Sequence, residues 1–298
     1  MYAILGAAGK VGFATSSALR KAGLPVRAIL RDASKAAPLR EIGCEIAVAD
    51  LQDSLALAKA IGDADTVHII LPPSPQAKDP AEEMRRAIES LAAALEEARP
   101  KRVLAISDYG AHITHDIGMP TMCRTFEERL RQLDCQKVFL RSAEHMQGWG
   151  RAIPAAIESG TLLSFHDPVD MQFPTISAPD LGLIAAEILL QNSSDKDVEI
   201  VHAEGPRRYS AKNVATALGE LLGRTFNVEA VPRSQWKEAF ERVMSVTLAE
   251  LLIKANDAQN EGGLVDVEPN SDSVRYGTTE LIDALRPLLP SQQDGIHG

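Results

Sequence analysis

The chain has 298 residues, of which 45% are hydrophobic and 24% are charged, and its formal net charge is −10. This length exceeds one ordinary domain, so we expect one large α/β domain with an appended lobe, or two domains. The acidic balance argues against a nucleic-acid partner, and no apolar run approaches the roughly 20 residues of a membrane span.

The cysteines and the N-terminus indicate a cytoplasmic protein. Cys44, Cys123 and Cys135 form no Cys-x-x-Cys pair, which argues against a disulfide framework and against a thiolate zinc site. The first strand-like run starts at Tyr2, so we expect no signal peptide ahead of the fold.

Short apolar runs alternate with helical patterns through the first half of the chain. The runs are continuous rather than alternating, which is typical of strands covered by helices on both faces. The pattern predicts an α/β fold with a Rossmann-type, doubly wound parallel sheet. The predicted strands are 2–5, 26–30, 45–49, 66–71, 102–106 and 137–140, and the predicted helices are 11–21, 35–42, 54–61, 80–98 and 121–133.

The second half of the chain is less regular. Residues 255–276 read as a polar, irregular loop, and the last eight residues as a frayed end. We expect a Rossmann domain of residues 1–145, to which about 172–205 return, and a smaller, mostly helical lobe of 146–171 and 206–298, with the substrate cleft between them. The predicted helices here are 180–191, 211–222, 234–254 and 278–288, and the strand-like runs are 198–202 and 226–231.

A glycine motif lies between the first predicted strand and the first predicted helix. Gly6, Gly9 and Gly12 have the spacing Gly-x-x-Gly-x-x-Gly. A dinucleotide site needs glycine in the tight turn, beside the pyrophosphate, and where the helix packs on the strand. The helix N-terminus then offers free N–H groups to the phosphates. The motif therefore predicts a nicotinamide dinucleotide site whose turn residues are Gly6, Ala8, Gly9, Lys10, Val11 and Gly12.

The ends of the next three strands indicate which dinucleotide binds. An acidic residue after the second strand is typical of NAD sites, whereas Arg31 stands here and Lys35 follows. Two cations suit a 2′-phosphate, so we expect NADP(H) rather than NAD(H), the alternative being a solvated Arg31 paired with Asp32. Asp50 is placed to accept from the adenine amino group. Leu71, Pro72 and Pro73 are placed to wall the cofactor's other side.

These motifs resemble those of the NmrA-like group of atypical short-chain dehydrogenase/reductases, over nearly the whole chain. The resemblance is nearest to NAD(P)H-dependent quinone reductases of the second type. It implies a Rossmann fold and cofactor binding. The group also contains non-catalytic redox sensors, so enzyme and sensor both stay open. The segments that carry the resemblance are 4–12, 26–32, 138–141, 176–181, 201–210, 222–224 and 231–232.

The usual catalytic pair of short-chain dehydrogenases is missing. None of Tyr2, Tyr109, Tyr209 and Tyr276 has Lys four residues later. A reduced ketone needs a proton donor because its alkoxide is nearly as basic as hydroxide, with a conjugate-acid pKa of about 15.7 for water. A reduced quinone resembles a phenolate, of pKa about 10, which solvent can protonate. The sequence therefore favours hydride transfer from NADPH to a small-molecule acceptor such as a quinone. The alternative is a redox-sensing regulator that acts through a protein partner.

Other polar residues are weaker candidates. Ser107 follows the fifth strand and is placed to contact the cofactor, and Tyr109, His112 and His145 are candidate catalytic residues. Glu144 and His145 are either a solvated pair or a substrate contact. His112 and His115, followed by Asp116, have no evident third partner, so no metal site is predicted. Trp149 and Phe165 are expected to pack the lobe.

Overall fold

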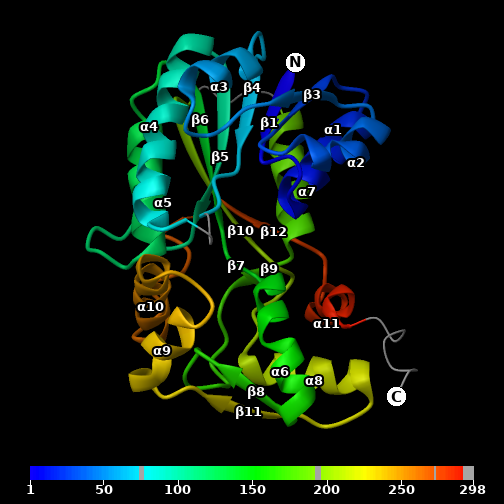
Figure 1. Cartoon of the computed structure of the whole chain (residues 1–298), viewed down its shortest axis with the longest axis vertical. Helices are drawn as coiled ribbons and strands as arrows, with labels where there is room; N and C mark the ends of the chain where they lie inside the picture. The colour runs from blue at the N-terminus through cyan, green and yellow to red at the C-terminus, as the bar shows by residue number, and fades with distance from the viewer. Residues whose placement is uncertain (74–76, 192–195, 272, 291–298) are drawn as a thin grey trace.

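The computed structural model describes residues 1–73, 77–191, 196–271 and 273–290. Its centre is an eight-stranded, wholly parallel sheet with the order β12-β10-β6-β5-β4-β1-β2-β3. The predicted α/β class and its doubly wound sheet are therefore confirmed (Figure 1). The strands are β1 (Tyr2–Leu5), β2 (Val26–Leu30), β3 (Glu45–Val48), β4 (Thr66–Ile69), β5 (Arg102–Asp108), β6 (Gln136–Ser142), β10 (Val198–Glu204) and β12 (Val274–Tyr276).

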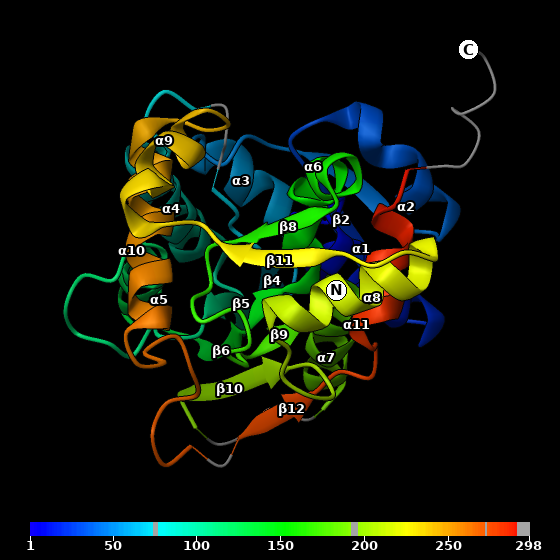
Figure 2. The same cartoon turned by 90° about the horizontal axis from the view of Figure 1, so that it is seen from below.

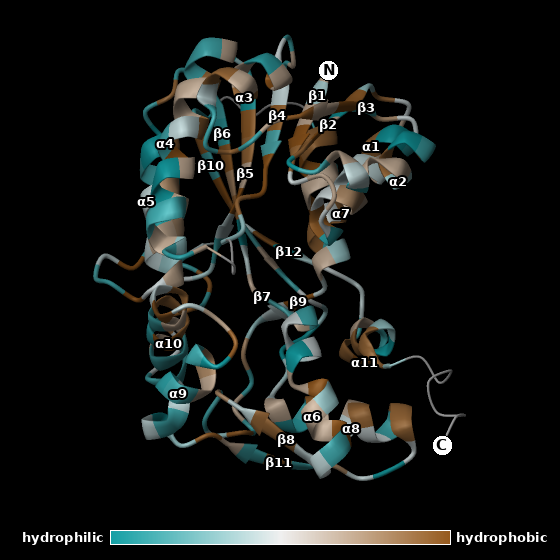
Figure 3. Ribbon diagram, in the orientation of Figure 1, coloured by the Kyte–Doolittle hydropathy of each residue, from teal (hydrophilic) through white to brown (hydrophobic). Residues whose placement is uncertain are grey.

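Helices cover both faces of this sheet (Figures 1 and 2). On one face lie α1 (Lys10–Lys21), α2 (Ala37–Glu41) and α7 (Ala178–Leu190), with a short 3-10 turn η1 (Ala33–Ala36) before α2. On the other lie α3 (Ser54–Ile61), α4 (Pro80–Ala98) and α5 (Met119–Leu130). Figure 3 shows the apolar residues concentrated on the central strands and the polar residues on the outer sides of α4 and α5, as two buried layers require.

Helix α1, which follows the glycine turn, packs unusually closely against α7. A Cβ atom on Gly182 of α7 would lie 2.3 Å from the carbonyl oxygen of Val11, so only glycine fits there. The hydroxyl of Thr15 on α1 donates to the Gly182 carbonyl at 2.9 Å. The position of α1, and with it the glycine turn, is thus fixed by a segment far away in the sequence.

The remaining elements form the lobe seen below the sheet in Figure 1. It is mostly helical, as predicted, and adds one parallel pair, β8 (Thr161–Ser164) with β11 (Asn227–Ala230). A second short pair, β7 (Glu144–His145) with β9 (Thr175–Ile176), follows β6. The other elements are η2 (Met146–Arg151), α6 (Ile153–Ser159), α8 (Ala211–Leu222), η3 (Arg233–Gln235), α9 (Trp236–Glu241), α10 (Val246–Asn260), α11 (Leu281–Leu285) and η4 (Arg286–Leu288).

Several expectations for the second half were wrong. The helix expected over 234–254 is divided into α9 and α10, because Ser245 caps a new helix through the Leu248 N–H. The loop expected over 255–276 is helical as far as Asn260, and residues 274–276 form β12. The helix expected over 278–288 is shortened to α11 and η4. Strand β12 is polar and exposed, and its pairing with β10 is a tertiary contact that no local pattern announces.

Asp180, in the first turn of α7, anchors the residues that follow β12 to this helix. Its carboxylate accepts the backbone N–H groups of Thr278 and Thr279, both at 2.7 Å, and the Thr279 hydroxyl at 2.8 Å. This buried carboxylate explains why an acidic residue opens α7. The division into 1–145 with 172–205 and a separate lobe stays a prediction, and the expected fraying of 291–298 lies outside the described residues. No described helix is long and apolar enough to cross a membrane.

Candidate functional site

The glycine motif forms the turn between β1 and α1. Gly6 has φ +76°, a conformation that L side chains rarely adopt, and its carbonyl accepts the Gly9 N–H at 3.0 Å. A Cβ on Gly12 would lie 2.5 Å from the Gly6 carbonyl oxygen, so Gly12 permits the helix to pack on the turn. A Cβ on Gly9 would lie 3.4 Å from the same oxygen, which is ordinary contact. Gly9 is therefore not required by the protein's own packing.

The turn presents an open helix N-terminus. Ala8, Gly9 and Lys10 are exposed, whereas Val11 and Gly12 are buried under the turn. Helix α1 has no side-chain cap, and neither have α5 and α7, whereas α3, α4 and α8 are capped by Asp53, Asp79 and Ser210. Uncapped N–H groups and the positive end of the helix dipole suit an anion such as a pyrophosphate.

A pocket of about 340 Å³ opens at the carboxyl ends of β2, β3 and β4, and β2 and β4 are the two neighbours of β1 in the sheet. We call it the β2–β4 pocket. It brings together the residues predicted to bind the adenosine half of the cofactor, although Lys35 lies on η1 outside its lining. It also adds residues of α4 that the sequence did not indicate. The lining residues are Arg31, Asp50, Leu51, Gln52, Leu71, Pro72, Pro73, Glu83, Met84, Arg86 and Ala87.

Arg31 is available for a ligand. Asp32, the partner that the alternative interpretation gave it, instead accepts the Ser34 N–H at 2.9 Å and the Ser34 hydroxyl at 2.6 Å. These hydrogen bonds from Ser34 lower the pKa of the Asp32 carboxyl. Among the residues that the structure describes, Arg31 makes no ion pair, so its exposed guanidinium keeps all its donors.

Near the carboxyl ends of β5 and β6, polar side chains form hydrogen bonds and ion pairs with one another. Arg141 and Glu127 form a buried two-point ion pair, with both N–O distances 2.9 Å. The Ser107 hydroxyl donates to Glu127 at 2.6 Å, and Arg141 also pairs with Glu268 at 2.8 Å. Ser107 therefore lies in the predicted region but with its hydroxyl already engaged.

Tyr109 and His112 lie beside this network. The ring of Tyr109 is fully buried, edge-on to His202 with centroids 5.4 Å apart, and its hydroxyl has no described partner. Burial raises the pKa of Tyr109 far above its ordinary value. His112 is half-buried, and burial lowers its pKa, with the Arg141 charge adding to the effect. Neither environment favours proton donation near neutral pH.

A different set of titratable groups lies at the ends of β5, β7 and β8, and we call it the β5–β8 cluster: Asp108, Glu144, His145 and His166. Glu144 pairs with the buried His166 at 3.2 Å. Burial raises the pKa of Asp108 to about 7, and the Glu144 charge adds to the rise. Burial lowers the pKa of His145. The Glu144 charge opposes this shift, and the charge of Lys10 in the glycine turn adds to it.

The sequence analysis missed Asp108 and His166. Asp108 ends a parallel strand, so the rule that selected Ser107 could also have selected it. His166 comes from the lobe, and only the fold brings it to Glu144. Trp149 and Phe165 pack within the lobe, Phe165 against Phe240 with ring centroids 4.3 Å apart.

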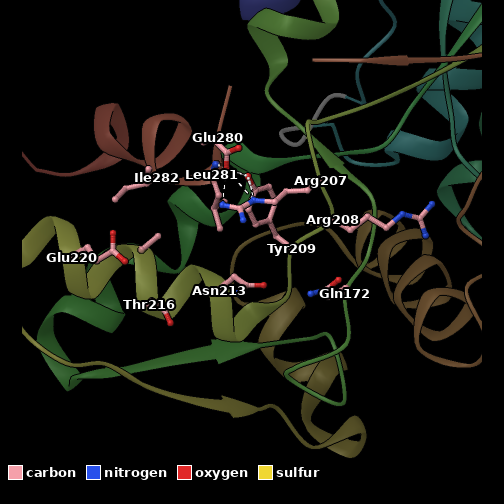
Figure 4. Close-up of a pocket in the computed structure, with 11 residues that line it drawn as sticks. Gln172, Arg207, Arg208, Tyr209, Asn213, Thr216, Glu220, Glu280, Leu281 and Ile282 are labelled. Carbon is pink, nitrogen blue, oxygen red and sulfur yellow. Dashed lines mark hydrogen bonds and ion pairs between the residues drawn. The ribbon is translucent and has the colours of Figure 1, made fainter. Parts of the chain in front are cut away.

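Two further features do not form a site. Over the described ranges, no three His, Cys, Asp or Glu residues are grouped as metal ligands, and Asp116 pairs with Lys254 at 2.6 Å. A second pocket, of about 220 Å³, lies between α8 and α11. Figure 4 shows Arg207 and Tyr209 turned toward Glu280 there and Arg208 turned away, and Glu280 accepts from Tyr209 at 2.5 Å and from Arg207 at 3.0 Å. Arg207 and Glu280 of this pocket are thus already paired with each other.

Comparison with known proteins agrees with this geometry. Residues 6–143 match the model of a family described as NAD(P)H-binding. The sequence is 26% identical over 240 residues, 80% of each chain, to NAD(P)H azoreductase of Xenophilus azovorans. It is 22% identical over 293 residues to quinone oxidoreductase 2 of Escherichia coli strain K12, covering 97% of this chain and 99% of that one.

Solved structures share the fold over almost the whole chain. The NADPH complex of the Escherichia coli quinone oxidoreductase has a TM-score of 0.78 at 22% identity, covering 97% of this chain and 99% of that one. The NADP(H) complex of a Citrobacter sp. triphenylmethane reductase has a TM-score of 0.79 at 18% identity, with the same coverage. The resemblance to the NmrA-like, atypical short-chain dehydrogenase group is confirmed. The match over residues 6–143 supports NAD(P)H binding, and the chain is distantly homologous to an NAD(P)H azoreductase and to a quinone oxidoreductase.

Proposed function

We propose that this protein is an NADPH-dependent oxidoreductase that reduces a quinone-like acceptor. The observations that carry the proposal are the β2–β4 pocket, with Arg31 free to bind a 2′-phosphate, and the uncapped N-terminus of α1 after the neighbouring strand β1. Its relatives include proteins named as a quinone oxidoreductase and an azoreductase, both of which act on flat, conjugated molecules.

The residues divide the work of binding. The uncapped N–H groups at the start of α1, beginning with that of the exposed Lys10, are placed to bind the pyrophosphate, and Asp50 to accept from the adenine amino group. Leu71 and Pro72 wall the adenosine side. Bound NADPH would supply the hydride. The polypeptide then has to hold the acceptor against the nicotinamide and keep competing water away, which is catalysis by positioning.

The proton requirement is small for a quinone. The product oxygen resembles a phenolate, of conjugate-acid pKa about 10, so water near neutral pH can protonate it. The β5–β8 cluster adds Asp108, whose pKa of about 7 makes it a stronger acid than a phenol. Quinone reduction is therefore compatible with a chain that lacks Tyr-x-x-x-Lys.

The test is NADPH oxidation, followed by loss of the nicotinamide absorbance, with matched panels of quinones, azo dyes, ketones and aldehydes. We expect turnover with quinones and poor turnover with ketones and aldehydes. Binding of NADPH without oxidation above background by any acceptor would contradict the proposal and favour the redox-sensor alternative. Efficient ketone reduction would also contradict it and would direct attention to Asp108 as the proton donor.

A further inference from the structure

The β2–β4 pocket contains a second arginine that no sequence motif indicated. Arg31 reaches the pocket from the end of β2, whereas Arg86 reaches it from α4, more than fifty residues later. Both side chains are exposed, so both guanidinium groups can move toward a ligand without breaking the core. The two cations thus approach one hollow from different elements.

Neither guanidinium is neutralised by the protein. In the described part of the chain, neither Arg31 nor Arg86 has a carboxylate within 4.0 Å, even though Asp50 and Glu83 line the same pocket. The contrast with the preceding residue is direct, because Arg85 pairs with Glu82 at 3.0 Å. In an acidic protein, two unpaired cations at one pocket are a site where a bound anion gains from both.

The chemistry of the pocket assigns the anion. Its walls, Leu51, Leu71 and Met84, are apolar and suit the faces of an adenine ring, while Asp50 can only accept hydrogen bonds. The Gln52 amide already donates to the Glu83 carbonyl at 3.0 Å, which leaves the two arginines as the charged donors of the lining. A phosphate on the adenosine ribose offers oxygens to both guanidinium groups at once, which a ribose hydroxyl does not.

We propose that Arg86 is a second specificity residue for the 2′-phosphate of NADPH, which it binds together with Arg31. The inference rests on the proposed function in requiring that NADPH is the cofactor. It predicts that the preference for NADPH over NADH depends on two elements, the end of β2 and helix α4. Loss of either arginine weakens binding only of the phosphorylated cofactor.

The test measures dissociation constants for NADPH and NADH by calorimetry on the full chain. Arg86→Ala should weaken NADPH binding about 10-fold and leave NADH binding unchanged, and Arg31→Ala should weaken NADPH binding about 10- to 150-fold. Arg85→Ala, the matched control on the same helix, should change neither constant. The double variant Arg31→Ala/Arg86→Ala should lose less than the product of the single effects, because both residues act on one phosphate.

The outcomes separate this inference from the proposed function. If the parent protein prefers NADPH and Arg86→Ala leaves that preference intact, the inference is overturned while the cofactor assignment stands. If Arg86→Ala weakens NADPH and NADH equally, Arg86 contacts the shared adenosine instead, and the inference again fails. Equal affinity of the parent protein for both cofactors overturns both.

Discussion

After β1 the helix N-terminus has no side-chain cap and after β2 Arg31 has no described ion pair, whereas at the ends of β5 and β6 most polar side chains are bonded to one another. The first region offers an uncapped helix and unpaired arginines to a ligand. In the second region, Ser107 and Arg141 both bond to Glu127, and Tyr109 packs on His202. The difference shows that polar residues at the ligand-binding edge of a parallel sheet serve two purposes, and that burial and partners distinguish them.

The largest expected effect tests whether the second region is structural. Glu127→Gln removes the buried charge that pairs with Arg141 and should lower the free energy of unfolding by about 3–5 kcal/mol, because Arg141 keeps only the half-exposed Glu268. Urea unfolding measures it. Glu128→Gln, the neighbouring exposed residue of α5, should change stability by no more than about 0.5 kcal/mol. Equal stabilities for the two variants would show that the network is not structural.

The next effect tests whether the first region is open for a ligand. Gly9→Val should fold normally, because its Cβ meets only the Gly6 carbonyl at 3.4 Å, yet should weaken NADPH binding more than about 100-fold by blocking the pyrophosphate. Thermal unfolding and calorimetry together check this. Gly12→Val, whose Cβ would lie 2.5 Å from the Gly6 carbonyl oxygen, should instead fail in folding. Normal NADPH binding by Gly9→Val would mean that the cofactor lies elsewhere.

A smaller effect concerns Asp108, the carboxyl group at the end of β5. Because burial raises its pKa to about 7, the folded chain holds this proton between about pH 4 and 7 while the unfolded chain does not, so its contribution to stability falls as pH rises through that range. Asp108→Asn should therefore raise the free energy of unfolding at pH 8 by about 1–3 kcal/mol and flatten its dependence on pH. Denaturant unfolding from pH 5 to 8 measures both.

The same variant sharpens the mechanism. Quinone turnover should change little with pH between about 6 and 8, and Asp108→Asn should keep most of it, because water suffices for a phenolate. Glu144→Gln should move the stability transition to lower pH by removing the charge that assists the rise in the Asp108 pKa. A quinone rate that falls above pH 7 in the parent protein, and not in Asp108→Asn, would instead make Asp108 an essential acid.

The smallest expected effect is at Tyr109. Its buried hydroxyl has no described partner, so Tyr109→Phe should leave stability unchanged or raise it by up to about 1 kcal/mol, with most quinone activity retained. Tyr209→Phe is the matched control, because that hydroxyl donates to Glu280 and accepts the Leu281 N–H, and its loss should cost about 1–2 kcal/mol. A large loss of quinone activity in Tyr109→Phe would restore Tyr109 as a catalytic candidate.

The sequence by itself determined the first region. A glycine turn, a following helix and a strand ending in Arg31 are local patterns, each written within about ten residues, and the parallel sheet brings the ends of its strands to one edge without further information. The strand and helix order through β6 was accordingly predictable, as was the resemblance to the NmrA-like group. The residues that line the β2–β4 pocket from β2, β3 and β4 follow from the same rule.

Only the tertiary structure decided the rest, because it depends on contacts between distant segments. Arg86 enters the pocket through the packing of α4, and His166 meets Glu144 through the lobe. The polar strand β12 pairs with β10, although its own sequence has no strand-like pattern. Whether Ser107, Asp108 or Tyr109 faces a ligand depends on which neighbours pack on each side of β5. The sequence does not distinguish these three adjacent residues, yet the structure places them in three different environments.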